Sequence, residues 1–271
     1  MSAARGRVRA DALLQSRGLA ASRAKAQALI MAGEVSSGPV RVDKPGALLA
    51  PDAPLAVAAR PRFVSRGGDK LDHALSVFVP RGLAIEGRVC LDIGASTGGF
   101  TDCLLQRGAA RVIAVDVGYG QLAASLRSDP RVEVHERVNA RDLAIEQLSA
   151  RPSLIVVDAS FIGIGKLMGA IARLLAPGGD LVALVKPQFE AGREAVSRGR
   201  GVIRDEAVRL GAVSKARAEI EEAGFAVVDE TDSAVAGPKG NVERFVWARA
   251  TPGREGAPSP LDPAGKAGER P

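Results

Sequence analysis

The sequence of 271 residues is long enough for one sizeable domain and a smaller one. Hydrophobic residues make up 46% of it and aromatic residues only 3%, so a core can form and must consist mainly of Ala, Val and Leu. The net charge of +6 favours a polyanionic partner without requiring one, and the absence of any apolar run of about 18 residues excludes a transmembrane helix.

The N-terminal sequence and the two cysteines indicate a cytoplasmic protein. Residues 1–16 contain no apolar segment of the kind that a secretory signal requires. Cys90 and Cys103 suit reduced thiols better than a disulfide framework, and Cys90 is expected to pack in a buried strand. No cluster of His and Cys has the spacing of metal ligands, so no metal site is predicted.

Residues 5–44 are predicted to form a small unit of two helices and a hairpin. Apolar residues with helical spacing mark a first helix that ends near Gly18. A second helix is predicted over residues 23–32, because Ser22 is a good N-cap. A hairpin turn at Gly38-Pro39 follows.

Basic side chains crowd these two predicted helices, with almost no acid beside them. They are Arg5, Arg7, Arg9, Arg17, Arg23 and Lys25. Such a cluster suits binding to the phosphate backbone of a nucleic acid. A solvated basic face is the alternative, and charge alone does not separate the two.

Composition indicates where the chain divides into domains. The first domain is predicted over residues 5–60, where a Pro- and Ala-rich stretch holds a further strand, and a linker over 61–68 follows. The second domain is predicted over residues 69–250 and begins with a helix. Residues 251–271 are rich in Pro, Gly and charge, which is typical of a disordered tail.

Strand and helix patterns alternate throughout the second domain. The strands are predicted at 89–93, 111–115, 132–134, 154–158, 181–186, 225–230 and 243–249. The helices are predicted near 99–107, 119–127, 142–149, 164–175 and 205–223, and a mobile loop at 190–201. This alternation predicts an α/β fold, with a seven-stranded, doubly wound and mostly parallel sheet.

The stretch from Val89 to Thr101, VCLDIGASTGGFT, organises this second domain. A buried strand, a turn of small residues and a helix N-terminus follow one another, which is the geometry that cradles a nucleotide-like ligand. Asp116 follows where such folds place the acid that binds ribose hydroxyls. The turn does not match G-x-G-x-x-G and fits S-adenosylmethionine (SAM) better than a dinucleotide, because SAM has no pyrophosphate.

Charged residues end two neighbouring apolar strands of the predicted sheet. Asp158 follows the strand LIVV, and Lys186 follows LVALV. Because the carboxyl ends of parallel strands meet at one edge, both side chains are expected to face the ligand crevice of a doubly wound fold. Two solvated charges are the alternative, but a pair beside a SAM-type turn favours a functional site.

This pairing suits methylation of a ribose 2′-hydroxyl group. The hydroxyl proton must leave as the oxygen attacks the sulfonium methyl group, so a base is needed nearby. A neutral lysine can be that base, and a second lysine with flanking carboxylates can orient it. Lys70, just before the first strand, and Glu243, at the start of the last, are the natural additional members, although each alone could be a surface charge.

Residues 7–35, RVRADALLQSRGLAASRAKAQALIMAGEV, resemble an S4 RNA-binding domain. The pattern of that domain is a helix, a Gly-Leu-x-x-Ser-Arg turn, a second helix and Gly-x-Val. The hairpin after Val35 is shorter than in the usual pattern, so its turn departs from it. The resemblance implies a small α+β module that binds structured RNA.

The motifs GASTGGFT, DVGYGQL, VKPQFE, GNVERF and the upstream VSRGGDKL resemble the TlyA-type family of bacterial ribosomal RNA 2′-O-methyltransferases, some of which are called hemolysin A. The resemblance covers residues 5–249 and implies an FtsJ-like, Rossmann-like catalytic domain that uses SAM. It also implies cytidine in 16S or 23S ribosomal RNA as the substrate. Phe63 stands where the family's linker often has tryptophan.

The resemblance assigns roles to individual residues. The family's Lys-Asp-Lys-Glu tetrad matches Lys70, Asp158, Lys186 and Glu243, with Lys186 as the proton acceptor, Asp158 as its modulator and the other two as positioning groups. The implied SAM-binding residues are Asp92, Gly94, Ala95, Ser96, Thr97, Gly98, Gly99, Phe100, Asp116, Val117 and Asn139. Arg66 joins the basic residues of the first domain as an implied RNA contact.

Two other functions compete with an RNA methyltransferase that acts as a monomer. The first is an RNA-binding ribosome assembly factor that keeps the fold without turnover, against which the complete tetrad argues. The second is a membrane-active hemolysin, which the family's older name suggests and the missing apolar segment disfavours. His73, His135 and Tyr119 are expected to have structural rather than catalytic roles.

Overall fold

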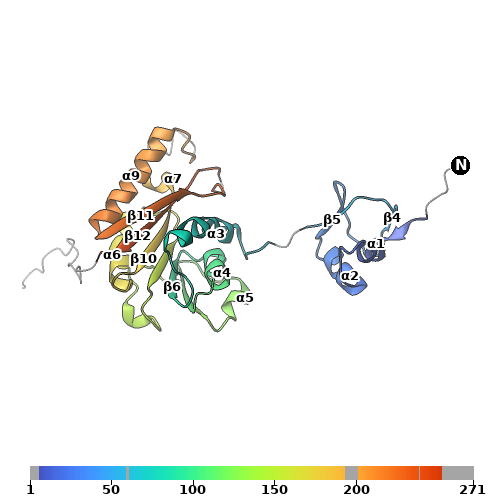
Figure 1. The fold of residues 1–271 in the computed structure, drawn as a ribbon, viewed down its shortest axis with the longest axis horizontal. Helices are drawn as coiled ribbons and strands as arrows, with labels where there is room; N and C mark the ends of the chain where they lie inside the picture. The colour runs from blue at the N-terminus through green and yellow to red at the C-terminus, as the bar shows by residue number, and fades with distance from the viewer. Residues whose placement is uncertain (1–5, 59–60, 193–200, 238, 252–271) are drawn as a thin grey trace, which may run out of the picture. The chain divides into compact units, whose positions relative to one another are not determined.

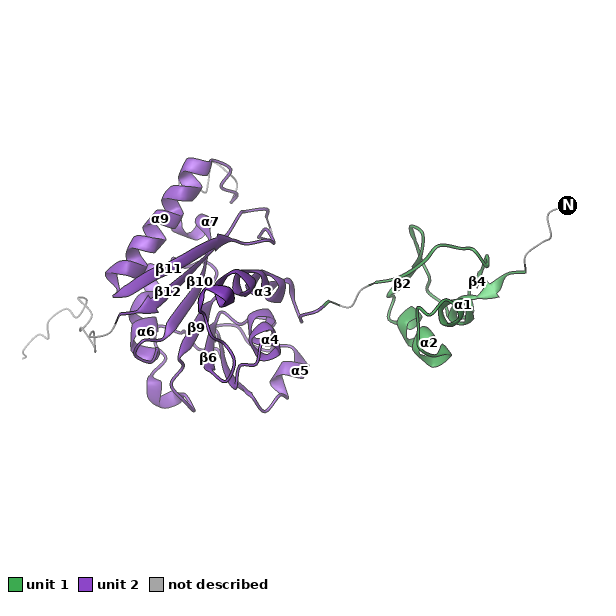
Figure 2. Cartoon of the chain, in the orientation of Figure 1, with its two compact units in different colours: residues 1–61 green, residues 62–271 purple. Residues whose placement is uncertain are grey.

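The computed structural model describes residues 6–58, 61–192, 201–237 and 239–251. The chain divides between Pro61 and Arg62 into two compact units (Figure 2). The predicted tail lies outside the described residues except for Thr251, and so does most of the loop predicted at 190–201. Arg5, a predicted RNA contact, also lies outside them.

The first unit contains the two predicted helices and several short strands. These are β1 (Val8–Arg9), α1 (Ala10–Ser16), α2 (Arg23–Met31), β2 (Val35–Ser37), β3 (Val40–Arg41), β4 (Leu48–Leu49) and β5 (Leu55–Val57). The first helix starts later than its apolar pattern indicates, because Val8 and Arg9 pair with β4 instead. Ser22 caps α2 as predicted, since its Oγ accepts a 3.1 Å hydrogen bond from the Lys25 N–H.

The second unit is built on a seven-stranded sheet. Its strands are β6 (Val89–Ile93), β7 (Arg111–Asp116), β8 (Val132–Glu136), β9 (Leu154–Val157), β10 (Asp180–Val185), β11 (Phe225–Asp232) and β12 (Arg244–Ala250). They lie in the order β11-β12-β10-β9-β6-β7-β8. Only β12 pairs antiparallel with its described neighbours, β10 and β11. The predicted doubly wound, mostly parallel sheet is therefore confirmed.

Helices cover both faces of this sheet. They are α3 (Arg66–Phe78), α4 (Gly99–Gln106), α5 (Ala124–Arg127), α6 (Gly165–Leu174), α7 (Pro187–Glu190) and α9 (Glu206–Glu222), with 3₁₀ turns at Val79–Arg81 and Ile145–Gln147. Figure 1 shows α3 and α4 on one side of the sheet and α6 and α9 on the other. Successive side chains of β6 point to opposite faces of the sheet, so Cys90 packs in one hydrophobic core and Leu91 in the other. Each face therefore needs helices to cover it.

Two of the predicted helices are much shorter than expected. The helix predicted at 119–127 contains only α5, because the preceding residues form turns whose amides bind acidic side chains. Gly118 N–H donates to Asp116 Oδ1, and Gly120 N–H donates to Glu136 Oε1. The helix predicted at 142–149 is reduced to the 3₁₀ turn at Ile145–Gln147. Apolar spacing alone did not reveal these breaks.

The ends of several central strands lie at one edge of the sheet. The parallel strands β6, β9 and β10 all end there, and β12 starts there because it runs in the opposite direction. The register sets Val185, before Lys186, opposite Arg244, after Glu243. The strand order reverses between β6 and β9, and a doubly wound fold binds its ligand at such a point.

Candidate active site

A cavity of about 250 Å³ opens at this edge, beside the ends of β6 and β9. Its walls are formed by Ser65, Arg66, Gly67, Lys70, Gly94, Ala95, Ser96, Thr97, Gly99, Phe100 and Asp158. The turn predicted to bind SAM thus lies in one wall, apart from Gly98. The start of α3 and the end of β9 form the others. Ser65 and Gly67 are additional wall residues that sequence reasoning missed.

Close backbone contacts explain the glycines of the turn. Gly94 has a φ of 86°, and a Cβ there would lie 2.9 Å from the carbonyl oxygen of Asp158. A Cβ on Gly99 would lie 2.3 Å from Ser65 Oγ. A larger residue at either position would push the turn away from β9 or α3. A Cβ on Gly98 would instead meet Leu126, so this glycine supports the start of α4.

Asp92 lies beneath the turn and is fully buried. Its Oδ2 accepts a 2.7 Å hydrogen bond from Thr101 Oγ1, whereas its Oδ1 has no hydrogen-bond partner within the described part of the chain. Burial raises the pKa of Asp92 to about 7, and the hydrogen bond from Thr101 opposes this rise. Asp92 does not line the cavity, but an unsatisfied carboxylate oxygen beneath the turn suits a cationic ligand such as SAM.

The other predicted cofactor residues lie around the end of β7. Asp116 Oδ2 accepts a 2.8 Å hydrogen bond from the Ser96 N–H, which fixes the turn against β7. Val117 is exposed, and Asn139 Oδ1 accepts a hydrogen bond from the Arg141 N–H. Neither of these two residues lines the cavity. Their contacts with SAM stay predictions.

Lys186 forms an ion pair with Asp158, as the two strand ends suggest. Its Nζ lies 2.6 Å from Asp158 Oδ1, 3.2 Å from the Asp158 carbonyl oxygen and 3.0 Å from Ser160 Oγ. The contacts with the Asp158 carbonyl oxygen and with Ser160 Oγ are hydrogen bonds, and the contact with Asp158 Oδ1 is an ion pair. Burial raises the pKa of Asp158, and the charge of Lys186 opposes that rise. Ser160 is a neighbour that sequence reasoning missed, because a serine in a loop carries no pattern.

Lys70 and Glu243 form a second buried ion pair. Lys70 Nζ lies 2.6 Å from Glu243 Oε2, and the Lys70 and Glu243 side chains are 9% and 1% exposed. Gln188 Nε2 donates a long, 3.5 Å hydrogen bond to Glu243 Oε1. Two residues before Glu243, the buried Asn241 bonds to Ile203 and Gly201 and so fixes the chain leading into β12.

The two ion pairs lie close enough to interact. The charges of Lys70 and Glu243 both affect the pKa of Asp158, the first lowering it and the second raising it. Lys70 and Asp158 line the cavity. Lys70 is paired with Glu243, just before β12, and Asp158 with Lys186, just after β10. The structure therefore brings the four side chains of the predicted tetrad together beside the predicted SAM turn. Their catalytic roles remain predictions.

In the first unit, a buried acid organises part of the predicted RNA-binding cluster. Asp11 is fully buried, and its carboxylate accepts hydrogen bonds from the side chains of Arg9, Arg23 and Gln27. The Arg9 guanidinium holds the pKa of Asp11 well below its usual range. Arg17 instead donates to the carbonyl oxygens of Pro51 and Ala53.

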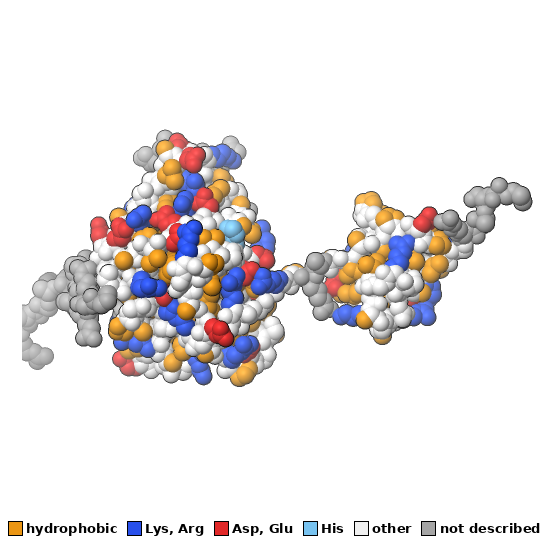
Figure 3. All heavy atoms as spheres, in the orientation of Figure 1, with side chains coloured by type: hydrophobic (Ala, Val, Ile, Leu, Met, Phe, Trp, Pro, Cys, Tyr) orange, Lys and Arg blue, Asp and Glu red, His pale blue; other side chains and the backbone are white. Residues whose placement is uncertain are grey.

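The remaining predicted RNA contacts are exposed. Arg7 and Lys25 lie on the surface of the first unit, and Arg66 lies at the mouth of the cavity in the second. Figure 3 shows basic side chains on the visible face of each unit, together with acidic ones. Sequence reasoning described the cluster of the first unit as having almost no acid beside it and missed the role of Asp11.

The described residues contain neither a membrane-spanning helix nor a cluster of metal ligands. None of the helices that the structure describes is long and apolar enough to cross a membrane. Within the same residues, no group of three His, Cys, Asp or Glu side chains is placed to hold a metal ion.

The fold and the cavity define a class of protein: a Rossmann-like SAM-dependent methyltransferase domain preceded by a small α+β unit. Comparison with family models agrees, because residues 63–250 match the FtsJ-like methyltransferase model and residues 8–53 match the S4 domain model. The chain belongs to the FtsJ-like methyltransferase family, within its TlyA-type group of members that carry an S4 domain.

Individual relatives support this assignment. A Mycobacterium tuberculosis protein named 16S/23S rRNA (cytidine-2′-O)-methyltransferase TlyA is 46% identical over 90% of this chain and 90% of its own. Hemolysin A of Brachyspira hyodysenteriae is 44% identical over 87% of this chain and 97% of its own. A solved structure of a hemolysin candidate from Streptococcus thermophilus has a TM-score of 0.69 at 40% identity, and covers 92% of this chain and 90% of its own.

Proposed function

We propose that this protein is an RNA methyltransferase that transfers the methyl group of SAM to the ribose 2′-hydroxyl of cytidine in ribosomal RNA. The observation that carries the proposal is the convergence of two lysine–carboxylate pairs, one buried and one partly buried, beside the glycine turn of a SAM-type cavity. The names of the relatives supply the nucleoside and the RNA class. A ribosomal substrate implies a cytoplasmic location.

The residues of the cavity fit SAM. The turn from Gly94 to Phe100 and the carboxylates of Asp92 and Asp116 would hold it, because SAM carries a cationic sulfonium, an ammonium group and a ribose. When bound, SAM supplies an activated methyl group for direct displacement by an oxygen nucleophile. Such a transfer needs no metal.

The protein must position the ribose hydroxyl group and remove its proton. Lys186 in its neutral form accepts that proton at Nζ, since it lies beside the cavity wall formed by Asp158. Asp158 and Ser160 hold the Lys186 amine in place and stabilise the ammonium that results. Lys70, paired with Glu243, places a positive charge on the cavity wall, where it can orient the substrate oxygen.

The first unit would bind structured RNA through its basic side chains. Arg9 and Arg23 are half exposed while their charges are partly balanced by Asp11, so they present oriented guanidinium groups rather than mobile ones. Arg66, exposed at the mouth of the cavity, would contact RNA phosphates near the target nucleotide. Contacts of this kind position RNA without reading its sequence.

Transfer of a tritiated methyl group from SAM to purified ribosomal subunits tests this function. We expect label in RNA, and nuclease digestion of that RNA should yield 2′-O-methylcytidine. Tight binding to subunits without any label would favour a non-catalytic assembly factor. Leakage of dye from protein-free phospholipid vesicles, together with absence of label, would favour a hemolysin.

A further inference from the structure

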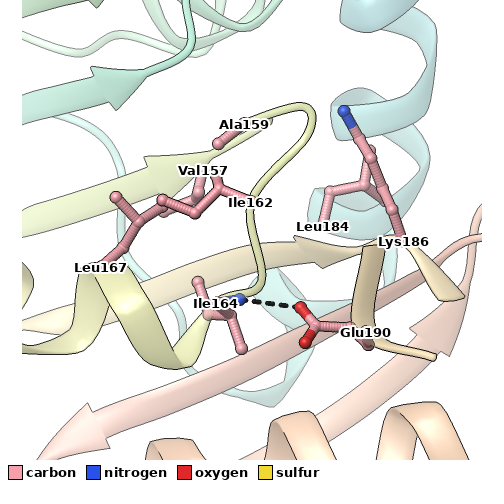
Figure 4. A pocket seen from close by; sticks show the side chains of 8 residues that line it. All are labelled: Val157, Ala159, Ile162, Ile164, Leu167, Leu184, Lys186 and Glu190. Carbon is pink, nitrogen blue, oxygen red and sulfur yellow. Dashed lines mark hydrogen bonds between the residues drawn. The ribbon is translucent and has the colours of Figure 1, made fainter. Parts of the chain in front are cut away.

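Glu190 lies four residues after Lys186, in α7, and its side chain is buried. Its Oε1 accepts a 2.7 Å hydrogen bond from the Ile164 N–H at the start of α6 (Figure 4). Ile164 occupies the N-cap position of α6. Its side chain is apolar and cannot accept a hydrogen bond from the first turn of the helix. Glu190 therefore caps α6 from a different element of the fold.

The segment that Glu190 holds is the one that carries Asp158. Residues 158–164 connect β9 to α6 without regular structure. Phe161, within this segment, has a φ of 67°, a conformation that residues other than glycine rarely adopt. The ring of Phe161 touches that of Phe189 in α7, with centroids 5.3 Å apart, while Phe161 stays 90% exposed. The segment is thus held in a strained conformation by contacts with α7.

Residues 158–164 contact the chain after β10 at both of their ends. Lys186 bonds to Asp158 and Ser160 at one end, and Glu190 bonds to Ile164 at the other. Figure 4 shows the Glu190 carboxyl group facing the start of α6, whereas the amine of Lys186 points away from it. Glu190 therefore does not touch the reacting groups and can act on them only through the backbone.

We propose that Glu190 is a positioning residue, which fixes Asp158 and Ser160 relative to Lys186 by tying residues 158–164 to α7. The inference rests on the proposed function, because the hydrogen bond between Glu190 and Ile164 affects catalysis only if Lys186 is the proton acceptor. Loss of the hydrogen bond to Ile164 lets the strained segment relax. A misplacement of about 1 Å in a catalytic group can reduce the rate by about 100-fold.

A second glutamate provides a matched control for simple helix capping. Glu219 of α9 accepts a 3.2 Å hydrogen bond from the Gly165 N–H, at the same end of α6. Glu219 lies in α9, and its hydrogen bond goes to Gly165 rather than to Ile164. Its removal weakens the cap of α6 and leaves the tie from α7 in place. Lys215 lies near both glutamates and stays unchanged in every variant.

The experiment compares Glu190→Ala, Glu190→Gln and Glu219→Ala in the full chain with ribosomal subunits as substrate. We expect Glu190→Ala to lower kcat by about 10- to 100-fold. The KM for RNA and the Kd for SAM, measured by calorimetry, should stay close to the wild-type values. Glu190→Gln keeps a hydrogen-bond acceptor at the same place, so it should restore most of kcat and leave the pH profile unchanged. Glu219→Ala should keep kcat near the wild-type value.

Hydrogen–deuterium exchange gives a readout that does not depend on turnover. The amide of Ile164 should exchange faster in Glu190→Ala than in the wild type, and return to slow exchange in Glu190→Gln. Wild-type kcat in Glu190→Ala, equal losses in Glu190→Ala and Glu219→Ala, or a parallel loss of SAM binding would each overturn the inference. If the wild type itself transfers no methyl group, the proposed function fails and the exchange result still tests the tie.

Discussion

Lys70 and Glu243 lie 173 positions apart in the chain, yet Lys70 Nζ lies 2.6 Å from Glu243 Oε2 in a buried ion pair. Lys70 comes from α3, which precedes the sheet, and Glu243 comes just before β12, the last strand. The contact therefore joins the first and last parts of the second unit at the edge of the cavity. A buried pair of this kind costs desolvation energy, so a catalytic role accounts for it better than stability does.

Separate changes to this pair should distinguish stability from catalysis. Glu243→Ala leaves the buried ammonium of Lys70 without its partner and should destabilise the protein by about 3–5 kcal/mol. The double variant Lys70→Met/Glu243→Leu removes both charges and should recover most of that loss, yet remain inactive. Urea unfolding and methyl transfer are the measurements. Activity in the double variant would contradict a role for the pair in catalysis.

Replacement of Lys186 by Ala should greatly slow methyl transfer and spare SAM binding. The expected loss in kcat/KM is about 10²- to 10⁴-fold, the usual contribution of a general base. The Kd for SAM should change little, because Lys186 is not part of the cavity wall. Single-turnover kinetics and calorimetry measure the two quantities. Methyl transfer at the wild-type rate would rule out Lys186 as the proton acceptor.

Asp92 should make the stability of the protein depend on pH. Its pKa is raised from the ordinary value of 3.8 to about 7, so the folded state favours the protonated form. The stability that this group contributes is complete below pH 3.8 and is lost as the pH rises to about 7. Asp92→Asn has no such loss, because its side chain is always neutral.

The free energy of unfolding of Asp92→Asn relative to the wild type should therefore increase across this range. The increase is at most about 4 kcal/mol, since one pKa unit corresponds to about 1.4 kcal/mol. Denaturant unfolding of both proteins at pH 5, 6, 7 and 8 measures it, with Asp102→Asn as a control on the helix that follows. A difference that does not vary between pH 5 and 8 would contradict the raised pKa.

Asp11 should be needed for the structure of the first unit. Asp11→Ala removes the shared acceptor of Arg9, Arg23 and Gln27, and the expected loss is about 2–3 kcal/mol within that unit. Hydrogen–deuterium exchange of the full chain should show faster exchange in residues 6–58 and unchanged exchange in the second unit. RNA affinity should fall as well. Arg7→Ala, a change at an exposed position, should weaken RNA binding without altering exchange.

Much of the fold could be predicted because it depends on local patterns. Short apolar runs bounded by glycine and charge located the strands, and the alternation of strand and helix gave their parallel arrangement. The predictions of helices at 119–127 and 142–149 were wrong over most of their length. Hydrogen bonds from other segments, such as that between Gly120 and Glu136, replaced hydrogen bonds within a helix. No local pattern contains that competition.

The sequence by itself determined the glycine turn at the end of β6 and the charges that end β9 and β10, because strand ends and tight turns are properties of a few adjacent residues. Resemblance added the identity of the family. Only the tertiary structure decided that Lys70 pairs with Glu243 and that Asp11 forms ion pairs with two arginines. The same holds for the hydrogen bond from α6 to Glu190 of α7. These contacts depend on strand register and on helix packing between segments far apart in the chain, and burial then sets their strength.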